Sequence, residues 1–186
     1  MQENSMVREK YQLMERYILC VGTLEERKNQ LKVVEAMEGL PKDVGLVLVG
    51  RPRGCYGKQV LECANERVRV LTGASFADFP LLYSGAVASV YLSRFEGFGI
   101  PVLESMCCDC PVVTSDVSSM PEAGGEAALY SAPDDVETVA SHLLRLCTDE
   151  AFRQERIAKG RIQRMRFAPE RVTQDMLAVY RSLFDD

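Results

Sequence analysis

The chain has 186 residues, of which 47% are hydrophobic and 26% charged, and its 22 Lys and Arg against 27 Asp and Glu give a formal net charge of −5. This length allows one domain with a real core and hardly two. The mild acidity argues against a general nucleic-acid or anionic-membrane surface, although a local basic patch remains compatible with it, and no apolar run approaches the roughly 20 residues that span a bilayer.

No signal-peptide pattern opens the chain. Its seven Cys lie mostly inside apolar runs such as residues 17–20. We therefore expect a cytoplasmic protein whose cysteines are reduced and act as small buried residues.

The predicted elements alternate along the chain. Residues 1–6 are polar and are expected to be disordered or a linker. Short apolar runs bounded by Gly or turn residues predict strands, and apolar residues at three- and four-residue spacing predict helices. The strands are predicted at residues 17–22, 45–50, 67–71, 87–93, 111–114 and 127–130. The helices are predicted at residues 7–13, 31–39, 58–65, 79–83, 102–108, 118–123, 134–147, 149–165 and 169–184.

Local signals support some of these helix boundaries. Ser75 is placed to cap the short helix at residues 79–83, and Asp134 with Glu137 forms a capping-box pattern. The final helix carries one apolar stripe, made of Val172, Met176, Val179, Tyr180 and Leu183.

This alternation predicts an α/β domain. Strands that are apolar on both faces are typical of a parallel sheet covered by helices on each side. We expect a Rossmann-like parallel sheet of about six strands. In such open sheets ligands bind at the carboxyl ends of the strands. The loops after Gly22 and Gly50 lie there, and so does the stretch at residues 94–104.

The stretch at residues 94–104 has the pattern of a phosphate-binding turn. A predicted strand leads into Gly97 and Gly99 on either side of Phe98, and Pro101 opens a helix. Free backbone N–H groups and the helix dipole favour an anion at such a turn. Two carboxylates, Glu96 and Glu104, bracket it. The alternative is a purely structural strand-to-helix turn.

Lys28, with Arg27 beside it, follows the first strand and would reach the same edge of the sheet. A cation facing a helix N-terminus makes a diphosphate clamp; the alternative is a solvated charged loop. Gly57-Lys58 resembles the end of a Walker loop, but Pro52 and Gln59 stand where that motif needs Gly and a hydroxyl residue.

The remaining candidates favour structural roles. The CxxC spacing at residues 107–110 ends a helix, where the dipole opposes a thiolate, so a redox site is disfavoured. His142, the single histidine, lies in the middle of a predicted helix away from the ligand edge. No Asp-x-Asp pair is present to hold a metal-bound diphosphate, and we predict no metal site.

With these motifs in order, residues 7–184 resemble the C-terminal, donor-binding domain of a retaining GT-B glycosyltransferase, in the large group that includes bacterial mannosyltransferases. The resemblance is carried by residues 17–29, 46–50, 79–86, 96–104 and 110–115. Residues 96–104 match the E-x7-E signature of that group. The resemblance implies one half of a GT-B fold.

The resemblance also implies roles for individual residues. Lys28, helped by Arg27, would bind the diphosphate, and Glu104 would accept hydrogen bonds from the ribose hydroxyls. Glu96 would meet the donor sugar, and Glu96 and Lys28 would be the catalytic residues. Backbone groups near the phosphates or sugar would come from Gly97, Phe98, Gly99, Ile100, Val102 and Leu103. The base would lie against the loops after Gly50 and Leu71, and no metal or other cofactor would be needed.

Two positions depart from the group's pattern. Thr23 stands where many members have Arg, so Arg27 would have to replace a second diphosphate cation. Asp109 stands where Gly is usual, at a helix end that often has a left-handed backbone. The N-terminal acceptor-binding domain of the group is absent from residues 7–186, so we expect a fragment, a recombinant piece or the product of a degenerate gene.

The predicted function is therefore the donor-binding half of a hexosyltransferase that moves a sugar from a GDP- or UDP-sugar to a glycan or lipid acceptor. GDP-mannose is the first expectation. This chain alone should bind nucleotide weakly and transfer no sugar. It should bind no nucleic acid, associate with membranes only through the absent domain, and could self-associate through the surface left uncovered.

Two other functions remain open. One is a non-catalytic nucleotide-sugar-binding module of a complex, which the upstream coding sequence would distinguish. The other is a sugar-nucleotide epimerase of the same architecture, against which the E-x7-E signature argues. The sequence does not define the base, sugar, acceptor, linkage or oligomeric state.

Overall fold

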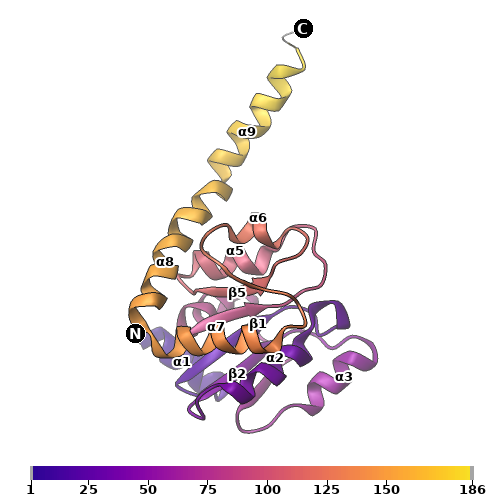
Figure 1. Cartoon of the computed structure of the whole chain (residues 1–186), viewed down its shortest axis with the longest axis vertical. Helices are drawn as coiled ribbons and strands as arrows, with labels where there is room; N and C mark the ends of the chain where they lie inside the picture. Colours follow the sequence, from indigo (N-terminus) through magenta and orange to yellow (C-terminus); the bar gives the residue numbers. More distant parts are fainter. Residues whose placement is uncertain (1, 185–186) are drawn as a thin grey trace.

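A computed structural model describes residues 2–184 of the protein. Its centre is one parallel sheet of six strands in the order β3-β2-β1-β4-β5-β6 (Figure 1). The strands are β1 (Arg16–Val21), β2 (Val44–Val49), β3 (Val68–Leu71), β4 (Ala88–Tyr91), β5 (Val112–Ser115) and β6 (Leu129–Ser131). The predicted fold class, a Rossmann-like parallel α/β sheet, is confirmed.

Burial on both faces explains the continuous apolar runs in the strands. In β1, Ile18 and Cys20 pack into the core on one side of the sheet. Tyr17 and Leu19, which alternate with them, pack into the core on the other side. A parallel strand covered by helices on both faces has no solvent-facing position for polar residues.

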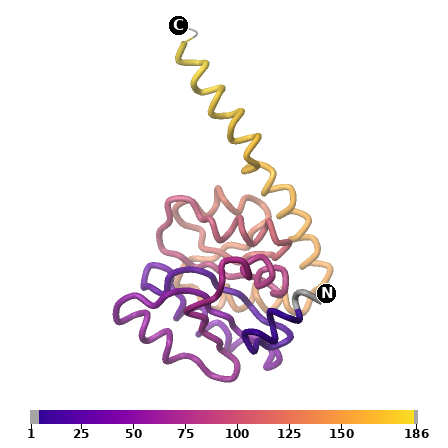
Figure 2. The backbone as a smooth tube through the Cα atoms, turned by 180° about the vertical axis from the view of Figure 1, so that it is seen from behind, coloured from indigo at the N-terminus to yellow at the C-terminus, as the bar shows by residue number. Residues whose placement is uncertain are grey.

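The helices that cover the sheet are α1 (Gln2–Tyr11), α2 (Gln30–Ala36), α3 (Gly54–Glu62), α4 (Phe79–Gly85), α5 (Ile100–Cys107), α6 (Met120–Gly124), α7 (Val136–Thr148) and α8 (Glu150–Arg164). Helices α2, α3 and α7 bury their apolar residues on one face. Helices α1 and α4 cover half of the opposite face, and α5 and α6 cover its other half (Figure 2). Short 3₁₀ turns occupy Glu26–Lys28, Met37–Gly39, Phe76–Asp78 and Met165–Phe167.

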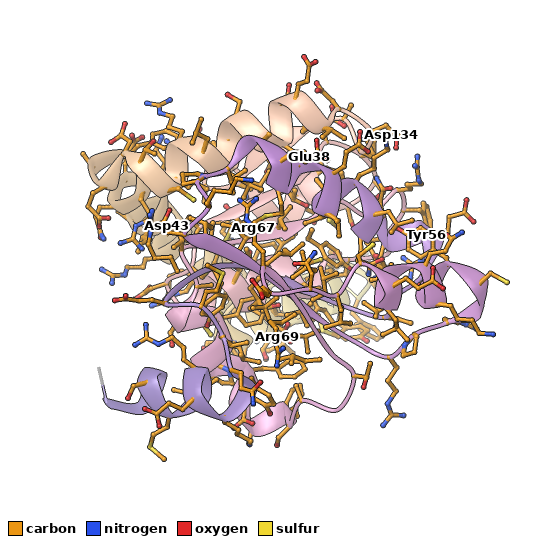
Figure 3. All side chains as sticks on the ribbon, turned by 90° about the horizontal axis from the view of Figure 1, so that it is seen from below. Glu38, Asp43, Tyr56, Arg67, Arg69 and Asp134 are labelled. Carbon is orange, nitrogen blue, oxygen red and sulfur yellow. The ribbon has the colours of Figure 1, made fainter. Side chains whose placement is uncertain are left out.

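Because all strands are parallel, the sheet has two chemically different ends. Asp43 precedes β2 and pairs with Arg16 at the start of β1, at the amino ends of the strands. Asp134 and Tyr56 follow strands and lie toward the carboxyl ends. Figure 3 shows Asp43 well separated from both.

The last helix, α9 (Pro169–Ser182), leaves the body of the domain. It continues from α8 and projects outward (Figures 1 and 2). None of its residues is buried, and its predicted apolar stripe is exposed, with Val179 62% and Leu183 68% accessible. The spacing predicted the helix correctly, but the stripe has no partner among residues 2–184. None of the helices in this range is long and apolar enough to cross a membrane.

Some local expectations differ from the structure. Residues 2–6, expected to be loose, belong to α1, while residue 1 lies outside the described residues. Ser75 precedes a 3₁₀ turn without a side-chain cap. Helix α7 is capped by Asp135, whose carboxylate accepts from the Thr138 N–H at 3.0 Å. Asp134, the predicted cap, instead pairs with Arg94.

The cysteines are free, as expected, but not all are buried. Cys20 and Cys110 are buried, and burial raises the pKa of each thiol to about 12. Cys55 and Cys107 are exposed. The prediction that all cysteines serve as buried apolar residues was therefore wrong for these two.

Asp109 has the left-handed backbone expected at the end of α5, with φ of 54°. Its carboxylate accepts two hydrogen bonds from Arg161 of α8, at 2.9 and 2.7 Å. These bonds lower the pKa of Asp109. The Asp at this position, where the backbone favours Gly, thus links the end of α5 to α8 through its side chain.

Candidate functional site

The candidate site lies at the carboxyl ends of β1 and β4, where two loops are joined by their backbones. The N–H of Arg94 donates to the carbonyl of Arg27 at 2.8 Å. The Ser93 Oγ atom lies 3.1 Å from the same carbonyl oxygen. The loop after β1 and the loop that leads into α5 therefore hold each other in place.

Glu96 is the centre of this site. Its Oε1 atom accepts hydrogen bonds from Arg27 at 2.6 Å, Ser93 at 2.7 Å and Tyr91 at 2.8 Å, and also from the Lys28 ammonium. The side chains of Lys28 and Glu96 are only 11% and 13% exposed. The structure thus brings Glu96 together with Lys28 and Arg27, which precede it by 68 and 69 positions in the sequence.

The backbone of Glu96 is held from a third loop. Its N–H donates to the Ser118 hydroxyl at 3.1 Å, and its carbonyl accepts from the Ser119 hydroxyl at 3.1 Å. Both serines follow β5. Three strand ends therefore fix the position of one carboxylate.

The charges in the cluster stabilise one another. Burial alone would favour the neutral carboxyl, but the hydrogen bonds from Lys28, Ser93 and Tyr91 outweigh it and lower the pKa of Glu96. Burial raises the pKa of Tyr91, and its hydrogen bond to Glu96 raises it further, so the hydroxyl keeps its proton. Burial disfavours the Arg27 cation, but Glu96 and Glu25 outweigh this effect and raise its pKa.

Lys28 also contacts the Tyr91 side chain. Its ammonium group donates to the Tyr91 hydroxyl and lies 4.9 Å from the centre of the Tyr91 ring. Glu25 accepts from Arg27 at 2.9 Å and pairs with Arg53 at 3.3 Å. Three cations, Arg27, Lys28 and Arg53, therefore share two carboxylates, Glu96 and Glu25.

The turn before α5 offers backbone donors beside this cluster. The N–H groups of Gly97, Phe98, Gly99 and Ile100 donate no hydrogen bond to residues 2–184. A run of free N–H groups at a helix start favours an anion. No other atom of residues 2–184 would lie within 4 Å of a Cβ at Gly97.

One backbone group expected at the ligand is already used. The Val102 N–H donates to the Gly99 carbonyl at 3.0 Å, and the Val102 side chain is buried. The predicted contribution of the Val102 N–H is therefore corrected to a structural role, while that of Leu103 stays a prediction.

Glu104 lies one turn into α5 and does not hydrogen-bond to the Glu96 cluster. It accepts a hydrogen bond from the Tyr83 hydroxyl of α4 at 3.1 Å. Tyr83 is 2% exposed, and burial, followed by the nearby Glu104 charge, raises its pKa well above the ordinary value. Tyr83 therefore stays protonated and fixes one oxygen of Glu104.

Sequence reasoning missed Tyr91, Ser93 and Tyr83 as members of the site. Tyr91 and Ser93 lie within the stretch interpreted as a buried strand, and both are indeed buried. The sequence gives one signal for Tyr91 and Ser93. They are polar residues two positions apart, which places both on one face of an extended segment just before Glu96. Tyr83 gives no such signal.

Gly57 and His142 make structural contacts. The Gly57 Cβ position would lie 2.8 Å from the Leu24 carbonyl oxygen, so close packing of α3 explains this glycine. A ring nitrogen of His142 lies 3.1 Å from the Tyr130 carbonyl oxygen. Within residues 2–184, no group of three or more His, Cys, Asp and Glu side chains is arranged to hold a metal ion.

Fold and site together define a parallel α/β domain with a cationic cluster and free backbone donors at one strand edge. The family described as "Glycosyl transferases group 1" matches residues 1–163. The chain belongs to this family.

Relatives support the same assignment. The chain is 36% identical to "O-antigen chain mannosyltransferase B" of Escherichia coli over 95% of this chain and 49% of that protein. It is 34% identical to "O-antigen chain mannosyltransferase RfbU" of Salmonella typhimurium over 65% of this chain and 35% of that protein. It thus spans about half or less of the curated relatives named here.

Solved structures share the fold. Sucrose-phosphate synthase from Thermosynechococcus elongatus is 27% identical, with a TM-score of 0.82 over 97% of this chain and 49% of that one. Anabaena Alr3699/HepE in complex with UDP is 21% identical, with a TM-score of 0.84 over 97% of this chain and 53% of that one.

Proposed function

We propose that this chain is the donor-binding half of a nucleotide-sugar-dependent hexosyltransferase that transfers with retention. The observation that carries the proposal is the cluster of Arg27, Lys28 and Glu96 beside the free N–H groups that precede α5. Cations and backbone donors at one edge match the chemistry of a bound diphosphate.

The leaving group is the reason for this arrangement. As the bond between sugar and phosphate breaks, negative charge develops on the departing diphosphate. Groups that are already oriented toward that charge stabilise the transition state without reorganising. Tyr91 and Glu96 hold Lys28 in place before any ligand arrives. In this proposal the two cations supply the compensation that a metal supplies elsewhere, and the reaction needs none.

The carboxylates recognise the neutral parts of the donor. Glu96 accepts hydrogen bonds from the sugar hydroxyls, and Glu104 accepts them from the ribose hydroxyls. Because Tyr83 binds one oxygen of Glu104, the other remains for the ribose. The proposed donor is GDP-mannose, which is supported by the 36% identity to a protein named as a mannosyltransferase.

Transfer requires a second domain in this proposal. The acceptor site and further catalytic groups belong to a part of the protein outside this chain, which spans 49% of its 36%-identical relative. The chain alone therefore binds donor weakly and does not transfer sugar.

A thermal-shift panel with UDP, GDP, ADP and their common sugars tests the binding. At about tenfold over Kd, linkage predicts roughly 1.4 kcal/mol of stabilisation, or about 3–6 °C. Lys28→Ala and Glu104→Ala should lose the shift. Asp43→Asn, at the opposite end of the sheet, is the matched control and should keep it. The absence of a shift with any nucleotide at millimolar concentration would contradict donor binding.

Catalysis and stereochemistry are tested separately. Robust sugar transfer by the chain alone to an added acceptor would refute the two-domain requirement. Nuclear magnetic resonance of the product made by a full-length protein would report whether the anomeric configuration is retained.

A further inference from the structure

The cations expected to bind the diphosphate are already paired with carboxylates. Lys28 donates to Glu96, while Arg27 donates to Glu96 and Glu25. Arg53, which shares Glu25 with Arg27, is the more exposed cation of this network, with its side chain 77% accessible. A phosphate that enters the site must share Lys28 and Arg27 with a carboxylate whose lowered pKa keeps it ionised at neutral pH.

The intact donor and the released product differ in how they meet this carboxylate. A nucleotide sugar carries hydroxyl groups, and these can donate hydrogen bonds to Glu96. A nucleoside diphosphate has no sugar to donate, and its terminal phosphate carries additional negative charge. Glu96 would therefore bind the sugar hydroxyls of the donor but repel the terminal phosphate of the product.

We propose that Glu96 is a specificity-determining residue that makes the site bind the intact donor in preference to the nucleoside diphosphate product. This inference rests on the proposed function. The Glu96 carboxylate competes with the terminal phosphate for Lys28 and Arg27. This competition is relieved only when sugar hydroxyls donate hydrogen bonds to the carboxylate. Glu96 thereby shifts the binding equilibrium from product toward donor.

The packing around Glu96 supports competition rather than release of the side chain. Four donors hold Oε1, and two serines hold the backbone of the same residue. With the side chain 13% exposed, the carboxylate has little freedom to swing away when phosphate arrives. Its charge therefore acts on any ligand that reaches the two cations.

The test is isothermal titration of GDP, UDP, GDP-mannose and UDP-glucose into the wild-type chain and Glu96→Gln. The substitution keeps the side chain's shape and removes its charge. The product of the correct base should bind about five- to tenfold more tightly to Glu96→Gln, as expected when a screened repulsion between like charges is removed from a partly exposed site. Its donor should gain less or lose affinity, and the gain for product should shrink at high salt.

The controls separate the explanations. Asp43→Asn makes the same change in net charge at the opposite end of the sheet and should leave all affinities unchanged. Lys28→Ala should weaken product and donor together. Thermal unfolding without ligand confirms that each variant is folded.

The outcomes distinguish this inference from the proposed function. If wild type binds nucleotide and Glu96→Gln binds the product equally or less tightly, Glu96 only positions the cations and the inference is wrong. If neither protein binds any nucleotide, the donor-binding function itself fails. Product binding by Glu96→Gln alone would support the competition most strongly.

Discussion

Replacing either of two glycines in one turn by Ala should affect different properties: stability for Gly99 and nucleotide binding for Gly97. A Cβ at Gly97 would have no other atom of residues 2–184 within 4 Å. Gly99 has φ of 97°, and its Cβ would lie 2.6 Å from the Met120 Cε atom and 3.4 Å from the Ala123 Cβ. The fold therefore requires Gly at position 99, whereas in our account the bound ligand requires it at position 97.

The magnitudes follow from these environments. For Gly99→Ala, the left-handed backbone costs about 1–2 kcal/mol and moving the flexible end of Met120 about 1 kcal/mol. The total of about 2–3 kcal/mol lowers Tm by about 4–12 °C. Gly97→Ala should change stability by no more than about 0.5 kcal/mol. Its methyl group would occupy ligand space, and we expect at least about tenfold weaker nucleotide binding, as for about 1.4 kcal/mol.

Thermal unfolding and titration with GDP and UDP, performed on both variants, test this contrast. The Gly99→Ala variant should be titrated at low temperature, where it is still folded, so that weaker binding is not confused with unfolding. Normal nucleotide affinity in stable Gly97→Ala would refute the assignment of this turn to the ligand. A large loss of stability in the same variant would show that the space beside Gly97 serves the fold.

Four further changes probe other parts of the domain. Asp109→Ala should destabilise the domain by about 1–2 kcal/mol because Ala disfavours the left-handed backbone, whereas Asp109→Gly should be nearly neutral; chemical denaturation compares the two, and equal losses would locate the effect in the Arg161 pair instead. Tyr83→Phe should cost about 0.5–1.5 kcal/mol and reduce the preference for GDP over 2′,3′-dideoxy-GDP, and an unchanged preference would separate Tyr83 from ribose recognition. Deleting residues 169–186 should leave Tm nearly unchanged because α9 buries none of its residues, so a fall of more than about 5 °C would contradict the exposed position of this helix. Glu96 has a folded pKa below its ordinary 4.5, so its stabilising contribution is complete above that pH and lost as pH falls through the folded value; the Tm difference between wild type and Glu96→Gln should shrink in acid, and a constant difference from about pH 3 to pH 7 would argue against an ionised Glu96.

Periodicity predicted most of the fold because burial is a regular property of its elements. Each strand has core on both faces, so runs such as β1 and β2 are continuously apolar. The same logic predicted α9 as an amphipathic helix but not its surroundings. A stripe shows that a face can be buried, and only the three-dimensional structure shows that nothing among residues 2–184 covers it.

The sequence predicted the parts of the site that charge and glycine spacing indicate. It did not predict the residues whose role depends on three-dimensional geometry. Lys28 and Glu96 were singled out from their places after strands, and they meet. The hydroxyl of Tyr91 could not be assigned, since a tyrosine in an apolar strand is usually core. Val102 was given a free N–H group because the helix start could not be located to the residue.

In the proposed function, nucleotide diphosphate binds between the Arg27–Lys28 loop and the turn that opens α5. Amide nuclear magnetic resonance of the chain titrated with GDP and UDP tests this placement, because the free N–H groups of residues 97–100 report their own environment. We expect one nucleotide to give its largest amide shifts at these residues and at Lys28. Saturable shifts confined to another part of the domain would contradict it, as would the absence of shifts at millimolar nucleotide.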